Sequence, residues 1–378
     1  MIRFLLISNN FSTLVNFRLD LIKEIQKSGI EVHVAAPGLV ESSKYVITLR
    51  KFDVVVHQIP VNRTTLNPFK DGLLLFSLIR LMISIQPHYL LSYTIKPVVW
   101  GNLAARFSNV PVTFSLITGL GYIFSEGNGS FRRRLLRSFS EKVYNVALKK
   151  NAIVFFQNPD DEYFFREANI INNKVPSVVL KGSGVNLMEY RAVPLPDEPI
   201  FIMVCRLLAD KGVREFVAAA EVVKSRHPNA IFRLAGPLDE NPESISQSEL
   251  NSWVKKKSIE YLGALDDVRP ALSEAAVFVL PSYREGTPRS ALEAMSMGRP
   301  IISTDVPGCR ETVVNSENGL LVKVKSVEEL VFAMEHLVNN SALRARMGRA
   351  SLRLACDEFD VNKVNNVMLR SMGLIYDS

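Results

Sequence analysis

Short apolar runs alternate with amphipathic segments along most of the chain. In the first half, seven runs predict strands: IRFLLIS, EVHVAA, FDVVVHQI, HYLLSY, VPVTFSLI, AIVFFQ and VPSVVL. Segments with helical spacing lie between most of them, for example VNFRLDLIKEIQKSG, which stops at Ser28 and Gly29. Buried strands that alternate with helices are typical of a parallel, doubly wound α/β sheet.

The alternation is interrupted once and then restarts. Residues 191–199, RAVPLPDEP, carry three prolines and three charges and predict a linker. Six further runs follow: IFIMVC, AIFRLAG, IEYLGA, AVFVLPS, PIIST and NGLLVKV. We therefore predict two Rossmann-like domains, at residues 1–193 and 199–355. We expect residues 356–378 to form a C-terminal helix that crosses back to the first domain.

Length and the spacing of potential metal ligands agree with this picture. A chain of 378 residues suits two domains, because single cores stop growing at roughly 250–300 residues. The three cysteines, Cys205, Cys309 and Cys356, lie far apart and have no CxxC spacing. The five histidines are not paired, and no D-x-D pair occurs. We expect no disulfide framework, no bound metal and a reducing compartment.

The apolar segments predict neither a signal peptide nor a membrane span. The first strand runs directly into the polar residues NNFST. The longest apolar segment, GLLLFSLIRLMISIQPHYLL, is broken by Arg80 and by Gln86 and Pro87, and it predicts a buried helix followed by a strand. We expect a cytoplasmic protein.

Charge is divided unevenly between the halves. Residues 1–195 hold 23 Lys and Arg against 13 Asp and Glu, and the remainder holds 22 against 25. A basic first half suggests an anionic partner, either a membrane surface or a nucleic acid. No nucleic-acid-binding signature occurs, so we expect no nucleic acid partner.

One basic segment in that half has the spacing of an amphipathic helix. In FRRRLLRSFSEKVYNVALKK the apolar residues form a helical stripe, and four arginines crowd the start: Arg132, Arg133, Arg134 and Arg137. These arginines predict docking on a membrane surface. The alternative is a helix that packs on the sheet with solvated arginines.

The stretch LPSYREGTPRSALEAMSMGRP predicts a strand, a loop and a helix. Thr287 as N-cap and Pro288 at the first helical position would begin the helix, with the amides of Arg289 and Ser290 facing an anion. Glu285 would lie in the loop and Glu293 about two turns into the helix. The alternative is an exposed loop glutamate and an ion pair between Glu293 and Arg289.

Neither half has G-x-G-x-x-G after its first strand, which disfavours a dinucleotide dehydrogenase. The turn CRLLADKGVREF instead supplies Arg206 and Lys211 where a strand leads into a helix. Cations at that position suit a diphosphate, although a solvated turn is the alternative.

These motifs together resemble a known family. VCRLLADKGVREF, FRLAGPLDENP, the region from IEYLGALDDV to CRETV, and NGLLV are similar in order and spacing to the retaining GT-B glycosyltransferases called glycosyl transferases group 1, or family 4. FRLDLI, GLGYIF and GSGVNLMEY extend the likeness over nearly the whole chain. More narrowly, DENP followed by YLGALDDV resembles bacterial N-acetylgalactosaminyltransferases that extend an undecaprenyl-diphosphate-linked amino sugar.

The resemblance implies a role for each motif residue. A UDP-sugar would be the donor and a polyprenyl-diphosphate-linked saccharide at the inner face of the cytoplasmic membrane the acceptor, with no metal or other cofactor. Glu285 would contact the donor sugar, Glu293 the ribose, and Arg206 and Lys211 the diphosphate. The remaining donor-binding positions are Gly286, Thr287, Arg289, Ser290, Asn9, Asn10 and Gly119.

Two positions depart from the family pattern. Many members have a glycine-rich turn after the first strand, where this chain has Ser8, Asn9 and Asn10. Many also have a histidine where this chain has Thr118, so no catalytic histidine is assigned. Two other classes stay open: a nucleotide-sugar 2-epimerase of the same architecture, and a non-catalytic nucleotide-sugar-binding partner.

Overall fold

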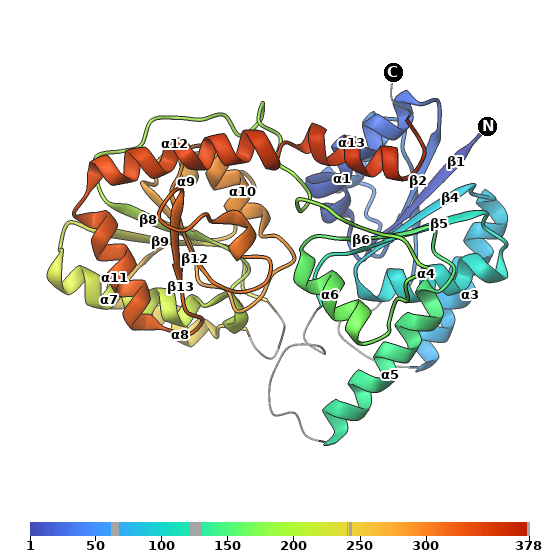
Figure 1. Ribbon diagram of the computed structural model, residues 1–378, viewed down its shortest axis with the longest axis horizontal. Helices are drawn as coiled ribbons and strands as arrows, with labels where there is room; N and C mark the ends of the chain where they lie inside the picture. The colour runs from blue at the N-terminus through green and yellow to red at the C-terminus, as the bar shows by residue number, and fades with distance from the viewer. Residues whose placement is uncertain (62–67, 121–130, 240, 242–243, 376–378) are drawn as a thin grey trace. The chain divides into compact units, whose positions relative to one another are not determined.

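The chain folds into two compact units. The computed structural model describes residues 1–61, 68–120, 131–239, 241 and 244–375. Residues 1–183 and 362–378 form the first unit and residues 184–361 the second, as the colours of Figure 1 allow the reader to follow. The sequence had predicted the first domain to extend to residue 193.

The first unit is built on a parallel sheet. Among the described residues it has seven strands in the order β3-β2-β1-β4-β5-β6-β7. All the ladders are parallel, as expected for strands that are apolar on both faces. Each lies in one of the predicted runs: β1 (Arg3–Ile7), β2 (Glu31–Ala36), β3 (Val55–Gln58), β4 (Tyr89–Tyr93), β5 (Val112–Ile117), β6 (Ile153–Phe156) and β7 (Ser177–Val179).

Helices cover both faces of this sheet (Figure 1). One face carries α1 (Phe11–Lys27), α2 (Lys44–Lys51) and α13 (Val361–Ser371). The other carries α3 (Pro68–Ile85), α4 (Ile95–Phe107), α5 (Phe131–Leu148) and α6 (Pro159–Glu167). Although α13 follows a helix of the second unit, its residues Val364 and Met368 pack into the core beside α1. The chain therefore returns to the first unit at its C-terminal end.

The second unit repeats the same construction. Its sheet, as described, has the order β10-β9-β8-β11-β12-β13, again with parallel ladders throughout. The strands are β8 (Ile200–Val204), β9 (Ile231–Ala235), β10 (Glu260–Tyr261), β11 (Val277–Leu280), β12 (Ile301–Thr304) and β13 (Gly319–Val322). The helices are η2 (Ala209–Lys211), α7 (Val213–Arg226), α8 (Gln247–Lys255), α9 (Arg269–Ser273), α10 (Arg289–Ser296), η3 (Arg310–Thr312), α11 (Val327–Val338) and α12 (Ser341–Glu358).

The proline-rich segment at residues 191–199 is fastened to the second unit by two buried arginines. Arg299 donates to the carbonyls of Val193 and Pro194, at 2.7 and 3.2 Å. Arg344 donates to the carbonyl of Asp197 at 2.8 Å. Since a guanidinium carries five donors, it can satisfy several carbonyls that a proline-rich segment leaves without partners. The segment is therefore an integral part of the second unit.

The longest apolar segment forms α3 and β4, as predicted, but α3 is not wholly buried. Its residues Leu74, Leu78 and Met82 are covered, whereas Phe76 and Ile83 face outward. Within the described part of the chain, no helix has both the length and the apolar content needed to cross a membrane.

Candidate active site

Two predicted site residues, far apart in sequence, meet at the carboxyl edge of the second sheet. Lys211 ends the short helix η2 after β8, and Glu285 lies in the loop after the neighbouring strand β11. Lys211 Nζ lies 2.6 Å from Glu285 Oε1, and each side chain is only 15% exposed. Ser282 Oγ donates to the same carboxylate oxygen at 2.9 Å. Ligands of open α/β sheets bind at such edges.

The pair keeps a positive charge in a partly desolvated place. Burial by itself lowers the pKa of Lys211, but the adjacent Glu285 carboxylate more than offsets this, and the pKa is raised overall. The ammonium group is thus protonated at neutral pH. A fixed cation with little water around it is suited to binding a phosphate oxygen.

Arg206 lies in the same turn but has a different partner. Its Nη1 is 2.8 Å from Asp239 Oδ2, and its side chain is half-exposed. The two cations predicted to hold one diphosphate are therefore each paired with a separate carboxylate. A phosphate that bound both would compete with Asp239 for Arg206.

The helix after the Glu285 loop begins one residue later than predicted. Pro288 is the N-cap of α10, and Thr287 lies outside the helix with its hydroxyl donating to the Gly286 carbonyl at 2.9 Å. The prediction of Thr287 as N-cap was therefore wrong. The Pro288 carbonyl accepts from the amides of Ala291 and Leu292, at 3.1 and 3.3 Å. This leaves the amides of Arg289 and Ser290 at the open end of the helix, where an anion is stabilised.

Glu293 forms the ion pair that was the alternative interpretation of this residue. Its Oε1 lies 3.0 Å from Arg289 Nε, and both side chains are nearly buried. Burial raises the pKa of Glu293, and Arg289 opposes the rise only in part. Arg289 also donates to the Gly184 carbonyl and lies over the ring of Tyr190, 5.8 Å from its centroid. A ribose that bound Glu293 would share the carboxylate with Arg289.

Three glycines allow the loops at this edge to approach one another closely. A Cβ on Gly212 would lie 2.1 Å from the Pro281 carbonyl oxygen, and a Cβ on Gly308 would lie 2.2 Å from the backbone carbonyl oxygen of Glu285. A Cβ on Gly236 would lie 1.7 Å from the carbonyl oxygen of Cys205. All three have positive φ angles, which favour glycine. Gly236 follows strand β9 and Gly308 follows strand β12. Their place after predicted strands could have identified them, from the sequence alone, as residues near the site.

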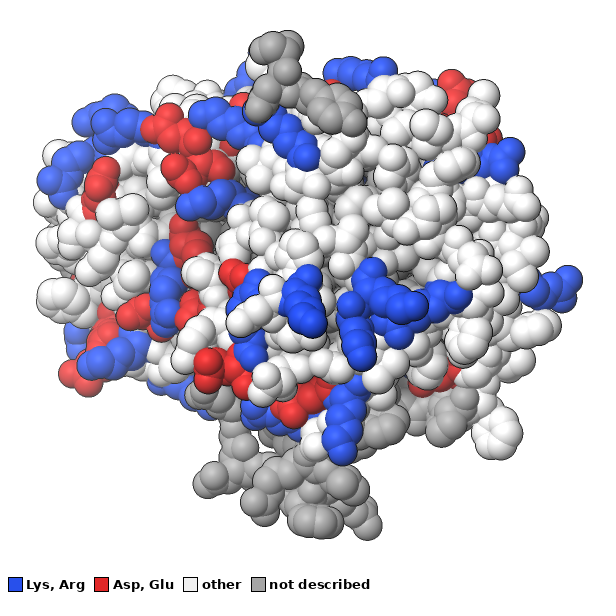
Figure 2. Space-filling view, turned by 45° about the vertical axis from the view of Figure 1, so that its right-hand side comes forward, with Lys and Arg blue, Asp and Glu red and all other residues white. Residues whose placement is uncertain are grey.

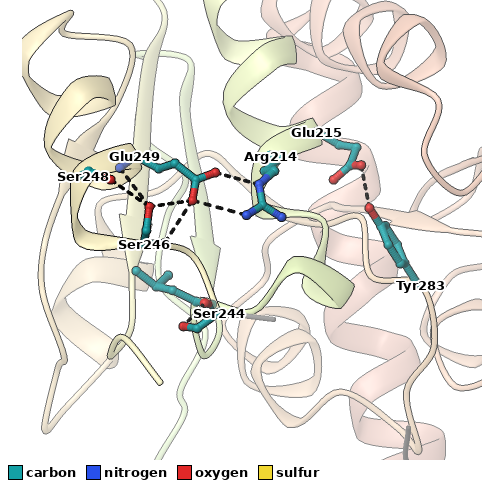
Figure 3. Close-up of polar contacts among 8 residues, drawn as sticks. Arg214, Glu215, Ser244, Ser246, Ser248, Glu249 and Tyr283 are labelled. Atoms are coloured by element: carbon teal, nitrogen blue, oxygen red, sulfur yellow. Dashed lines mark hydrogen bonds and ion pairs between the residues drawn. The ribbon is translucent and has the colours of Figure 1, made fainter. Parts of the chain in front are cut away.

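A second polar network joins the start of α7, just after the turn that carries Lys211, to the start of α8 (Figure 3). Arg214 binds Glu249 through Nε at 2.8 Å and Nη2 at 3.3 Å. Glu249 also closes a capping box with Ser246 at the start of α8. The S-x-x-E spacing is a recognised sequence signal, and the sequence interpretation missed it.

The loop after β11 is held against this turn by Tyr283. Its hydroxyl donates to Glu215 Oε1 at 2.6 Å, as Figure 3 also shows. Its backbone N–H donates to the Asp210 carbonyl at 2.8 Å. Asp210 and Glu215 lie on either side of Lys211 in the sequence. The two contacts therefore hold the turn that places the Lys211 side chain against Glu285.

Two thiols lie near this edge: Cys309 is buried and Cys205 is partly buried. Burial raises the pKa of both Cys205 and Cys309 to about 12. Both are therefore protonated at neutral pH, and a thiol in that state is a weak nucleophile.

The predicted first-unit residues lie at the carboxyl edge of the other sheet. Asn10 is the N-cap of α1, and its Oδ1 accepts from the Ser12 amide at 2.7 Å. Asn9 precedes it, and Gly119 follows β5 with a φ of 125°. Any contact of these three residues with a donor remains a prediction.

The arginines predicted to dock on a membrane belong to the start of α5. The side chains of Arg132, Arg133 and Arg134 lie outside the described part of the structure. Arg137 is described: it pairs with Glu141 at 2.9 Å and lies over the Phe164 ring, 5.1 Å from its centroid. One of the four arginines is thus engaged within its own unit.

The described side chains contain no cluster of three or more His, Cys, Asp or Glu that could hold a metal ion. The site is instead a set of cations, carboxylates and helix-terminal amides. Such groups can bind an anion and stabilise charge that develops on it during a reaction.

Comparison with protein families gives two matches. Residues 198–340 match the model of glycosyl transferases group 1, and residues 3–158 match a glycosyl transferase 4-like model. The first of these spans Arg206, Lys211, Glu285 and Glu293.

Two curated relatives are informative. The chain is 30% identical over 370 residues, 94% of both chains, to an N,N′-diacetylbacillosaminyl-diphospho-undecaprenol α-1,3-N-acetylgalactosaminyltransferase of Campylobacter jejuni. It is 24% identical over 302 residues, 75% of both chains, to a UDP-Gal:α-D-GlcNAc-diphosphoundecaprenol α-1,3-galactosyltransferase of Escherichia coli.

Solved structures support the fold. A sucrose-phosphate synthase of Thermosynechococcus elongatus matches 99% of this chain, with 98% of its own chain covered, at a TM-score of 0.80 and 18% identity. HepE of Anabaena in complex with UDP-glucose matches 99% of this chain, with 100% of its own covered, at a TM-score of 0.78 and 15% identity. The two parallel α/β units are thus those of the GT-B fold.

Proposed function

The chain belongs to the glycosyl transferases group 1 family and is a glycosyltransferase, and from this premise we propose that it transfers a sugar from a UDP-sugar to a polyprenyl-diphosphate-linked saccharide. The sugar is an N-acetylhexosamine such as GalNAc, and the anomeric configuration is retained. The product belongs to the assembly of a bacterial surface glycan or glycoprotein.

One observation carries the proposal: Lys211 and Glu285 meet at 2.6 Å where the loops after β8 and β11 converge, directly before the open end of α10. A departing nucleoside diphosphate gains negative charge as the bond to the sugar breaks. The Lys211 ammonium and the amides of Arg289 and Ser290 stabilise that charge, and Arg206 adds a solvent-facing contact. The carboxylate of Glu285 accepts from a sugar hydroxyl and that of Glu293 from the ribose.

Retention of configuration is proposed to proceed by attack of the acceptor on the same face of the sugar from which the diphosphate leaves. The bond from the anomeric carbon to the phosphate oxygen breaks as the acceptor hydroxyl bonds to that carbon. The leaving phosphate takes the hydroxyl proton. This route requires no enzyme nucleophile, which agrees with the protonated state of Cys205 and Cys309. No metal is required in this scheme.

Two relatives support the choice of acceptor. The Campylobacter and Escherichia enzymes are named for acceptors carried on undecaprenyl diphosphate. Such an acceptor resides in a membrane, so we propose that the protein associates peripherally with the inner face of the cytoplasmic membrane. We propose that Arg132, Arg133 and Arg134 attract anionic lipid headgroups, whereas Arg137 is already paired with Glu141.

A panel of UDP-sugars tested against lipid-diphosphate saccharides in a membrane mimetic examines the proposal. We expect UDP release that depends on both one donor and one acceptor. Conversion of the donor to its 2-epimer without any acceptor would identify an epimerase instead. Donor binding without turnover on every acceptor would favour a non-catalytic partner.

A further inference from the structure

The motif GSGVNLMEY ends at Tyr190, and hydrogen bonds fix the backbone of that residue against α10. The Tyr190 amide donates to the Asn186 carbonyl at 2.9 Å. Asn186 Oδ1 in turn accepts from the Met188 amide at 3.0 Å. From α10, Ser296 Oγ donates to the Tyr190 carbonyl at 2.5 Å. The backbone of Tyr190 is therefore held from both sides, and this sets the direction of its side chain.

The Tyr190 side chain forms a closed set of contacts with Arg289 and Glu293 of α10, which we call the Tyr190 cluster. Arg289 Nε lies 3.0 Å from Glu293 Oε1. The Arg289 guanidinium lies over the Tyr190 ring, 5.8 Å from its centroid, and donates through Nη1 to the Gly184 carbonyl. The Tyr190 hydroxyl is a hydrogen-bond partner of the Glu293 carboxylate. Each of the three side chains therefore contacts the other two.

Burial makes this cluster different from the charges at the surface. On the face that Figure 2 shows, blue atoms of Lys and Arg lie beside red atoms of Asp and Glu, most closely in the left-hand part of the view. Water and salt screen such exposed pairs. The side chains of Arg289 and Glu293 are only 14% and 12% exposed, so their charges act on their neighbours with little screening.

The surroundings decide which group of the cluster donates a proton and which accepts. Burial, and secondarily the Glu293 charge, raise the pKa of Tyr190, so its hydroxyl keeps its proton and is the donor. Burial also raises the pKa of Glu293, and the nearby Asp267 adds to the rise. Arg289 and the Tyr190 hydroxyl act against it, because both stabilise the ionised form. Tyr190 thus favours a Glu293 carboxylate that accepts hydrogen bonds.

The number of acceptor positions on Glu293 suits a ligand with two neighbouring hydroxyls. A carboxylate offers about four acceptor positions on its two oxygens. Among the described residues, Arg289 and Tyr190 occupy two of these positions. A ribose carries hydroxyls on its 2′ and 3′ carbons, and the two can donate to the positions that are left.

We propose that Tyr190 is a positioning residue for the nucleotide. By donating to Glu293 it aims the carboxylate at the two ribose hydroxyls, and the site thereby selects ribonucleotides over deoxyribonucleotides. The inference rests on the proposed contact of Glu293 with the ribose and deepens it. Tyr190 acts through Glu293 and Arg289 and does not need to touch the nucleotide. Arg289 is also the first residue of α10, so the cluster fixes the helix end that faces the diphosphate.

Binding of deoxynucleotides tests the role of the hydroxyl, since Tyr190→Phe removes it and keeps the ring. Calorimetric titration compares UDP, 2′-deoxy-UDP and 3′-deoxy-UDP. In the parent we expect loss of either ribose hydroxyl to weaken binding about tenfold or more, because a hydrogen bond to a poorly screened charge is lost. In Tyr190→Phe we expect UDP to bind about five- to tenfold more weakly and the penalty for a missing hydroxyl to shrink to about threefold or less.

Steady-state kinetics give a second readout of the same variant. Contacts to the ribose are made equally in the ground state and in the transition state. The KM for the UDP-sugar should therefore rise in Tyr190→Phe, while kcat changes by less than about twofold. Lys211→Met, by contrast, lowers kcat.

The pH dependence of UDP binding gives a third readout. The charged and titratable groups that face Glu293 are Arg289 on its own helix, Tyr190, and Asp267 in the loop after β10. Without the Tyr190 hydroxyl the pKa of Glu293 rises further, and the carboxylate takes up a proton earlier as the pH falls. UDP binding by Tyr190→Phe should therefore weaken at a higher pH than binding by the parent.

The alternative is that Tyr190 only fills space, since it also packs against the core of the second unit. The proposal is overturned if Tyr190→Phe binds UDP as the parent does. It is also overturned if the variant binds UDP and both deoxynucleotides more weakly by one common factor, because that pattern is a loss of packing. The matched control is Tyr163→Phe in α6, where the tyrosine is 67% exposed, and this variant should bind all three nucleotides as the parent does.

Nucleotide binding is measured without an acceptor, which separates this inference from the proposed function. The parent could discriminate against deoxynucleotides, lose this discrimination in Tyr190→Phe, and yet transfer sugar to no lipid-linked acceptor. That result would contradict the proposed function and support the role of Tyr190. Transfer by a parent that binds UDP and its deoxy forms equally well would overturn the role of Tyr190 and leave the proposed function intact.

Discussion

Lys211 Nζ and Glu285 Oε1 lie 2.6 Å apart, although the two residues are separated by 74 positions in the sequence. They meet because β8 and β11 are neighbours in the sheet and each leads into a loop at its carboxyl end. Both residues were identified from sequence motifs, and the fold brings their side chains together as an ion pair.

Removal of the Lys211 charge should slow transfer. In Lys211→Met we expect kcat to fall about 30- to 1000-fold, which corresponds to roughly 2–4 kcal/mol of lost transition-state stabilisation. Ground-state donor binding should weaken less, because the charge on the leaving diphosphate is greatest in the transition state. Steady-state kinetics and donor titration measure the two effects.

The matched control is Lys323→Met. Lys323 pairs with Glu329 at 2.8 Å, but its side chain is 83% exposed and it lies after β13. An ion pair this exposed contributes little because water screens it, so stability and kcat should both change little. Equal kcat values for Lys211→Met and the parent would contradict the assignment.

Substitution of Gly308 should disrupt the Glu285 loop. In Gly308→Ala the added Cβ would lie 2.2 Å from the Glu285 carbonyl oxygen, and the φ of +83° is unfavourable for alanine. The comparison variant is Gly263→Ala, where φ is +74° but no atom lies within 4 Å of the added Cβ. Gly263→Ala should cost only the conformational strain, about 1–2 kcal/mol.

Gly308→Ala should cost more than this and should also weaken donor binding, since the loop must move. Chemical denaturation and calorimetric titration with UDP provide the two measurements. Both alanine variants could instead lose the same stability and bind UDP as the parent does. The close contact between Gly308 and the Glu285 backbone would then not determine the geometry of the site.

Acid should destabilise the first unit through two stacked histidines. His33 Nδ1 and His57 Nε2 lie 2.9 Å apart, with Glu31 and Arg3 beside His33. Burial, and secondarily the charge of His33, lower the pKa of His57 from 6.5 to about 4. The unfolded chain binds the proton more readily, so this stabilising contribution is present above pH 6.5 and lost as pH falls toward 4.

The variant His57→Gln should therefore lose less stability than the parent between pH 6.5 and 4. Fluorescence of Trp100 in a Trp253→Phe background reports unfolding of the first unit separately. The control is His336→Gln, which changes an exposed histidine of the second unit and should leave unfolding of the first unit as in the parent. If the stability of the parent and that of His57→Gln fall with the same slope between pH 6.5 and 4, the two histidines take up no proton on unfolding.

The strands were predictable because a strand buried on both faces has a distinctive composition. All thirteen apolar runs correspond to strands, from β1 to β13. Their order in the sheet was not readable from the sequence, since each β-α unit could pair with several others. The contact of Lys211 with Glu285 depends on that order and therefore required the structure.

Other features escaped prediction for local physical reasons. Proline fixes φ near the helical value, so it fits either the N-cap or the first helical position, and Pro288 takes the former. Arg299 looks like any surface arginine in the sequence, yet it is buried and binds carbonyls of the predicted linker. Glycines such as Gly308 reveal their role only through the backbone that passes beside them.

The stereochemistry and stoichiometry of the product test the central claim most directly. UDP-GalNAc labelled in the sugar is incubated with a short-chain polyprenyl-diphosphate saccharide and followed by proton and phosphorus NMR. We predict that UDP and an α-linked lipid saccharide appear in equal amounts and that both form about 30- to 1000-fold more slowly with Lys211→Met. Formation of a β-linked product, or release of UDP at the same rate without the acceptor, would contradict a retaining transfer to a lipid-linked acceptor.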